Sequence, residues 1–273
     1  MAAPPPPPPD RPRTERGVGH VWPRVWGQVW GDAWGHWGAL LRLTGRVLAW
    51  ACMRSSYRGA RWRALAEQLV AAAVPAVWWY AVLSALFGQV LIRIVVVTAI
   101  GYGLTQYAVE MVVRVLVLEL IPLTAALFVL LRVTLGHGLA LQRLRDEGAF
   151  DDVRRAGGDP MRELALPRVL AGVFATLLLV ALSCVLALVL AYLNLYGFTP
   201  WALGSYTRAV GQIFDPAVTL IFALKTLGCA LAVSLVPMAA AFEPVPQGEL
   251  RALVRTAAVL LLVELASLIG NYY

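Results

Sequence analysis

Long apolar runs are the feature that most constrains this sequence. From residue 69 onward only short polar stretches interrupt them, and 60% of the 273 residues are hydrophobic while 14% are charged. A membrane-spanning helix needs about 20 consecutive apolar residues, whereas a soluble domain has roughly half apolar and about a quarter charged residues. The sequence therefore argues against a soluble enzyme or a disordered scaffold and predicts an all-α integral membrane protein.

The apolar runs divide into five predicted spans. The stretch from 69 to about 142 is too long for one span, and we divide it at a connection that contains Gly101, Gly103 and Gln106. A polar stretch separates this pair from three later runs. The predicted transmembrane helices of this multi-pass protein cover 69–92, 111–138, 167–195, 214–241 and 252–270.

Arginine is unevenly distributed among the connections, and this predicts the orientation. Ten Arg precede the first span and six lie in 143–168, whereas 196–213 contains only Arg208 and 93–110 only Arg93. Because Arg-rich connections remain in the cytoplasm, we expect the N-terminus inside and the C-terminus outside.

Two segments precede the predicted five-span domain, 69–273. Residues 1–20 include six consecutive prolines and are expected to form a disordered cytoplasmic tail. In the region 21–68, tryptophans recur every four residues and fall within an arc of about 120° on a helix. Since indoles favour the headgroup level of a bilayer, we expect an amphipathic helix in the cytoplasmic interface; the alternative is a helix packed on the membrane domain. These residues are Trp22, Trp26, Trp30, Trp34 and Trp37.

Motifs for catalysis or nucleotide binding are lacking in the sequence. A P-loop requires Gly-Lys-Ser/Thr, and the single lysine, Lys225, follows Leu224. No HExxH or GxSxG occurs, and the three Cys are widely separated. We therefore expect no catalytic residues, no metal site and no cofactor in this chain, so that ATP and Mg²⁺ would bind a separate subunit. With this hydropathy, the net charge of +7 indicates a membrane surface rather than nucleic acid.

The connection between predicted spans 2 and 3, about 139–166, contains a short amphipathic pattern. Phe150 and Val153 share one helical face among charges of both signs. Gly157 and Gly158 are expected to end that helix, and Asp159 to cap the next. The helix could dock into a groove on a partner or lie against the membrane. The candidate docking residues are Arg145, Glu147, Phe150, Asp151, Val153, Arg154 and Asp159.

Three motifs carry a resemblance to a known family. They are Leu118–Leu127 (LELIPLTAAL), the sequence Asp-Pro-Met-Arg at 159–162, and Leu-Pro-Arg at 166–168, with Arg132, Arg145, Lys225 and Arg251…Arg255 at fitting positions. Over about 40–270, the chain resembles the MlaE-type (YrbE-type) permeases, the membrane subunits of ABC transporters that work with MCE-domain proteins.

The resemblance implies a function and partners. It implies a dimer in the bacterial inner (cytoplasmic) membrane that moves phospholipids or other lipids across the envelope. The partners would be a cytoplasmic ABC ATPase bound through the connection between spans 2 and 3, an MCE-domain periplasmic protein, a second permease copy or paralogue, and membrane lipids. Gly148 and Ala149 depart from the acidic residue and Gln usual in the family. This keeps open a non-transporting anchor, or one half of a heterodimer.

Charged residues inside the predicted spans form a second candidate site. Such residues are costly in a bilayer and usually face a cavity or a partner. Glu110 and Arg114 are four residues apart and could pair, and Glu119 follows in the same span. They could line a path for a lipid headgroup or form an internal ion pair that fixes helix packing. The candidates for the lipid path are Arg93, Glu110, Arg114 and Glu119.

Overall fold

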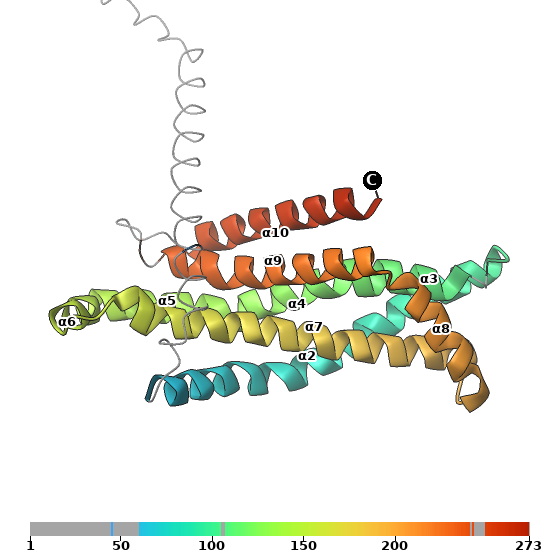
Figure 1. Cartoon of the computed structure of the whole chain (residues 1–273), viewed down its shortest axis with the longest axis horizontal. Coiled ribbons are helices and arrows are strands. Elements are labelled where there is room, and N and C mark those ends of the chain that lie inside the picture. The colour runs from blue at the N-terminus through green and yellow to red at the C-terminus, as the bar shows by residue number, and fades with distance from the viewer. Residues whose placement is uncertain (1–44, 46–59, 105–106, 241, 243–248, 273) are drawn as a thin grey trace, which may run out of the picture. The chain divides into compact units, whose positions relative to one another are not determined.

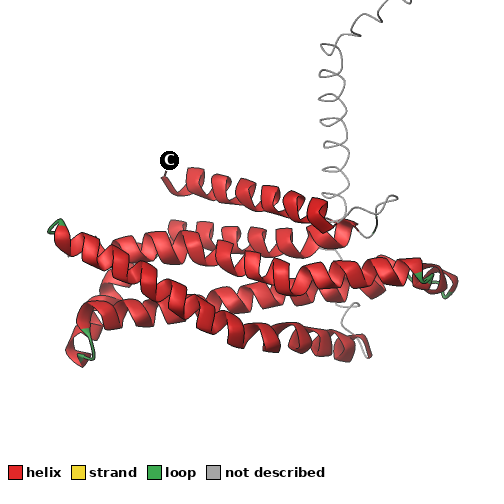
Figure 2. Ribbon diagram, turned by 180° about the vertical axis from the view of Figure 1, so that it is seen from behind, coloured by secondary structure: helices red, strands yellow, loops and turns green. Residues whose placement is uncertain are grey.

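The computed structural model describes residues 45, 60–104, 107–240, 242 and 249–272. Every regular element in this part of the chain is a helix (Figure 2), as predicted. The helices from Ala60 onward belong to one compact unit, Leu43–Tyr273. The predicted tail and the predicted tryptophan helix lie outside the described residues.

The five predicted spans are confirmed by helices that are long and apolar enough to cross a membrane. These segments are Ala73–Gly101, Ala108–Asp146, Met161–Tyr196, Pro216–Ala239 and Ala252–Gly270. The predicted end of the first span is wrong, because helix α2 (Ala60–Gly101) continues through Arg93. Arg93 resembles a loop residue only by its charge, whereas the β-branched apolar residues after it can remain helical in a membrane.

Span 2 is continuous but changes its helical geometry along its length. It comprises α3 (Ala108–Val112), the π-helix η4 (Val113–Leu120), α4 (Ile121–Val129), the π-helix η5 (Leu130–Thr134) and α5 (Leu135–Asp146). Pro122 lies just after η4 and cannot donate a backbone hydrogen bond to the preceding turn. A wider turn in front of a proline is one way in which a helix accommodates this loss.

Span 3 lies at the centre of the bundle. After α6 (Ala149–Arg155), it begins with the π-helix η6 (Met161–Ala165) and continues as α7 (Leu166–Tyr196), which packs against α2, α4 and α9. The short elements η7 (Pro200–Ala202) and α8 (Leu203–Ile213) lead into α9 (Pro216–Ala240), and α10 (Glu249–Tyr272) packs mainly on α9. Helix α6 lies at one end of the bundle, and α3 and α8 lie at the other (Figure 1).

Three spans approach one another closely at Gly172 in α7. A Cβ atom placed there would lie 2.6 Å from Ser234 Oγ on α9 and 2.8 Å from the methyl group of Thr134 in η5. Small residues allow helix backbones to approach in this way within membranes. Gly172 therefore sets the distance between spans 2, 3 and 4.

Candidate functional site

A buried lysine joins three spans. The Lys225 ammonium group on α9 donates hydrogen bonds to Glu119 of η4 and to Glu264 Oε1 of α10, the latter at 2.8 Å. The side chain of Lys225 is 1% exposed, and those of Glu119 and Glu264 are 14% and 16% exposed. We call these three residues the triad.

The triad contains more carboxyl groups than positive charges. One ammonium group faces two carboxyl groups, and one oxygen of each carboxyl is buried without a hydrogen-bond partner among the described residues: Glu119 Oε1 and Glu264 Oε2. A buried charge without a partner is costly. The triad is therefore an unusual electrostatic arrangement for the interior of a membrane protein.

The sequence indicated only one member of the triad as a site residue. The sequence offers Glu119 as a candidate for the lipid path and Lys225 as a residue that fits the family pattern and excludes a P-loop, but it gives no reason to select Glu264. Both missed residues are ionisable groups inside apolar runs, and that signal alone marks a residue for attention in a membrane protein. Their convergence depends on the packing of spans 2, 4 and 5.

A polar pocket lies between the start of span 2 and α8. Its volume is about 420 Å³, and it is lined by Tyr107, Val109, Glu110, Arg114, Ala209, Gln212 and Ile213. The predicted pairing of Glu110 and Arg114 is confirmed, since Arg114 Nε lies 2.9 Å from Glu110 Oε1. Both side chains remain well exposed, so the two opposite charges are accessible from the pocket.

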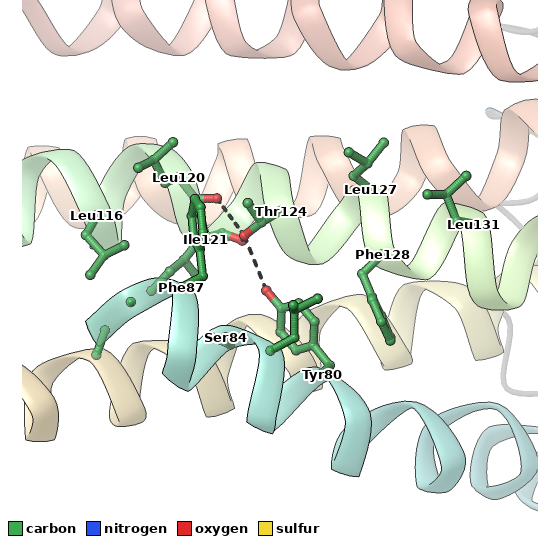
Figure 3. Close-up of a pocket in the computed structure, with 13 residues that line it drawn as sticks. Tyr80, Ser84, Phe87, Leu116, Leu120, Ile121, Thr124, Leu127, Phe128 and Leu131 are labelled. Carbon is green, nitrogen blue, oxygen red and sulfur yellow. Dashed lines mark hydrogen bonds between the residues drawn. The ribbon is translucent and has the colours of Figure 1, made fainter. Parts of the chain in front are cut away.

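An apolar pocket of about 280 Å³ lies between α2 and α4 (Figure 3). Hydroxyl groups of Tyr80, Ser84 and Thr124 interrupt its leucine and phenylalanine walls. Thr124 donates a hydrogen bond to the carbonyl of Leu120 at 2.8 Å. Because that interaction uses the Thr124 hydrogen, Tyr80 is the donor in the 3.3 Å contact between the two hydroxyl groups.

The structure does not bring the four candidates for the lipid path together. Glu110 and Arg114 line the polar pocket, and Glu119 lies in the triad. Arg93 is exposed on α2 and lines neither the polar nor the apolar pocket.

The predicted docking residues cluster around α6, but their side chains differ in exposure. Phe150 is only 5% exposed and packs on Phe242, with ring centroids 5.2 Å apart. Its ring belongs to a small core that includes Leu141 and Met161. Val153 and Arg145 are partly exposed, and the remaining candidates are exposed: Glu147, Asp151, Arg154 and Asp159. The surface that α6 offers to a partner is therefore mainly charged.

The predicted boundaries after α6 are confirmed. Helix α6 ends at Arg155, and Gly157 adopts a positive φ of 77°, which favours glycine. The Gly158 N–H then donates to the Val153 carbonyl at 2.9 Å. Asp159 Oδ1 accepts a hydrogen bond from the Met161 N–H at 3.0 Å, as expected of a helix cap.

A tyrosine cluster attaches α8 to α7 at the other end of the bundle. Tyr206 is buried, and its hydroxyl donates to the Leu188 carbonyl at 2.8 Å. Its ring lies 5.3 Å from that of Tyr192 and 6.1 Å from that of Tyr196. Burial raises the pKa of Tyr206 from 10.0 to about 12, and the nearby Tyr196 adds to this effect. Below that pH the Tyr206 hydroxyl therefore remains neutral and can donate its hydrogen bond to the Leu188 carbonyl.

Comparison with known proteins places these features in a family. No curated protein sequence matches the chain. Among the described residues, no group of three or more His, Cys, Asp or Glu side chains could hold a metal ion. The family model described as Permease MlaE matches residues 65–269, about three quarters of the chain. The chain therefore belongs to the MlaE permease family.

Proposed function

We propose that this chain is the permease subunit of an ABC transporter that moves phospholipids or other lipids across the bacterial envelope. The match to the MlaE permease family over 65–269 carries the proposal, since that family indicates a membrane permease of an ABC lipid transporter. In this proposal an MCE-domain protein and a second permease copy or paralogue complete the complex. The chain would lie in the inner membrane with its N-terminus and α6 on the cytoplasmic side.

The apolar pocket between α2 and α4 suits part of a lipid. Its volume of about 280 Å³ lies at the lower end of ligand pockets, which are roughly 300–1,000 Å³. The walls are apolar, and the exposed side chains of Leu83, Leu127 and Leu131 lie at its surface. An acyl chain can pack there without desolvating a charged group.

The polar pocket suits a zwitterionic headgroup. The Arg114 guanidinium group can bind a phosphate with charge-assisted hydrogen bonds, and the Glu110 carboxylate can bind an ammonium group. Because the two side chains are already paired at 2.9 Å, a headgroup with both charges can replace their mutual contact without leaving either charge unpaired. This pairing favours zwitterionic lipids over purely anionic ones.

The exposed charges around α6 suit the ATPase. Glu147, Asp151, Arg154 and Asp159 are solvent-accessible beside one another at one end of the bundle. Phe150 anchors α6 to the permease core and thereby fixes the direction of this surface. The ATPase would bind ATP and Mg²⁺ and act on the permease through α6.

Lipid crosslinking tests the apolar pocket directly. A photoreactive amino acid at Leu127, which lines the pocket, should capture phospholipid more efficiently than the same group at Val185, an exposed position on α7 outside the pocket. Equal capture at both positions would mean that the pocket binds lipid no better than the ordinary lipid-facing surface of the protein, and this would contradict the proposed role of the pocket. The transport proposal itself requires ATP-dependent movement of labelled phospholipid in vesicles that contain the complete complex.

A membrane anchor without transport activity is the second candidate. Phe150, the most hydrophobic residue of α6, is used in the core of this chain and is not offered to a partner. An anchor would assemble with the other subunits, yet ATP would cause no lipid movement in the same vesicles. Assembly together with ATP-dependent movement would reject this candidate.

A further inference from the structure

We infer that Glu119, Lys225 and Glu264 form a proton-binding site inside the membrane, in which the two carboxyl groups hold one exchangeable proton between them. The inference requires that the chain spans the membrane, but it does not require that lipids are transported. Its ligand is the proton itself, taken up from water.

The geometry places both carboxyl groups on the same ammonium group. Lys225 donates to both Glu119 and Glu264, which come from spans 2 and 5. Because both carboxyl groups lie within hydrogen-bond distance of one nitrogen atom, they are also close to each other. Two carboxyl groups that share a site in this way do not both ionise readily.

The charge balance requires one further positive charge. With all three side chains ionised, the triad has a net charge of −1, and Lys225 is almost completely buried. One proton on either carboxyl makes the triad neutral. The same proton is also a hydrogen-bond donor. It can satisfy one of the two oxygens that have no partner among the described residues, Glu119 Oε1 and Glu264 Oε2.

Nearby titratable groups do not supply that charge. The Cys229 thiol lies four residues after Lys225 on α9, but a thiol is not a cation. Arg114, which precedes Glu119 in η4, is paired with Glu110. On the neighbouring helices, Arg93 of α2 is exposed, and Cys184 of α7 is a thiol and therefore not a cation. Within the described residues, none of these groups forms an ion pair with a triad carboxylate.

The chemical step is a simple protonation. A carboxylate oxygen of Glu119 or Glu264 takes a proton from a hydronium ion of the surrounding water, whose O–H bond breaks to leave water, and becomes a carboxylic acid. Release of the proton leaves a net negative charge at the contact between spans 2, 4 and 5. The like charges of Glu119 and Glu264 would then repel each other across Lys225, where spans 2 and 5 meet α9.

Infrared spectroscopy of the full chain in phospholipid nanodiscs tests the inference. Exposed carboxyl groups are ionised near neutral pH, so a protonated carboxyl should give a separate C=O stretching band that shifts in D₂O. We expect this band in the wild type and its loss in both Glu264→Gln and Glu119→Gln, since each variant leaves one neutral lysine–glutamate pair. Lys225→Met should double the band, because two carboxyl groups then need protons.

The matched control is Glu67→Gln, which removes an exposed carboxyl at the start of α2 and should leave the band unchanged. Absence of the band in the wild type near neutral pH would overturn the inference, and this measurement needs no variant to fold. Persistence of the full band in both glutamine variants would also overturn it.

Discussion

The close approach of three spans at Gly172 allows a quantitative test of the packing. In Gly172→Ala the new methyl group would lie 2.6 Å from Ser234 Oγ and 2.8 Å from the Thr134 methyl group, whereas ordinary contacts begin at about 3.4 Å. Ser234 and Thr134 must therefore give way by about 0.8 Å and about 0.6 Å, through a change of rotamer or a shift of their helices. Overpacking of this kind costs about 1–3 kcal/mol.

The matched control for this variant is Gly136→Ala. Gly136 lies in the same continuous span as Thr134, and nothing lies within 4 Å of a Cβ atom placed there. Both variants gain helix propensity of up to about 1 kcal/mol, so this gain cancels in the comparison. We expect Gly172→Ala to have a free energy of unfolding about 1–3 kcal/mol below that of Gly136→Ala.

The assay is equilibrium unfolding in mixed detergent micelles, followed by circular dichroism. A second change identifies the contact: Ser234→Ala removes the closest atom, and Ser234 Oγ has no hydrogen-bond partner among the described residues. Gly172→Ala should therefore cost less in the Ser234→Ala background, with a coupling of about 0.5–3 kcal/mol. Equal stability of the two glycine variants would refute the close packing of spans 2, 3 and 4.

Three other predictions follow from the described contacts. Tyr206→Phe should remove one buried hydrogen bond, worth about 1 kcal/mol. Because the folded state holds the pKa of Tyr206 at about 12 instead of 10.0, wild-type stability should fall between these pH values more steeply than that of Tyr206→Phe; parallel pH profiles would contradict this. Phe150→Ala should lower the free energy of unfolding by about 3–5 kcal/mol. Arg154→Glu should change the free energy of unfolding by less than about 0.5 kcal/mol but should reduce co-purification of the ATPase. Unchanged co-purification would reject the docking surface around α6. Lys225→Met should cost about 3–5 kcal/mol in the same unfolding assay, and a neutral effect would show that the triad does not hold the spans together.

Span number and helix caps could be predicted from the sequence because they depend on local rules. An apolar run of about 20 residues has few alternatives to a membrane helix, and Gly157 followed by Asp159 marks the end of one helix and the cap of the next. The pair Glu110–Arg114 follows equally from helical spacing. Each of these features involves residues that are near neighbours in the chain.

Features that depend on packing between spans could not be predicted in the same way. A pattern on α6 places Phe150 on an amphipathic face, but it does not show that Phe242 covers this face. Glu119 and Glu264 meet only because α9 carries Lys225 between them. The sequence places the end of the first span before Arg93, whereas packing against the other spans allows α2 to continue to Gly101.

Span 2 connects these separate features, and the first of its two π-helical segments lies just before a proline. It carries Glu110 and Arg114 at one end, Glu119 and Thr124 in the middle, and α5 with its connection to α6 at the other end. Glu119 lies in η4, just before Pro122. A π-helical turn changes the direction in which the following side chains point, and such turns are frequent at functional sites. The carboxyl group that Lys225 binds therefore lies in the irregular segment of span 2 that directly precedes the proline.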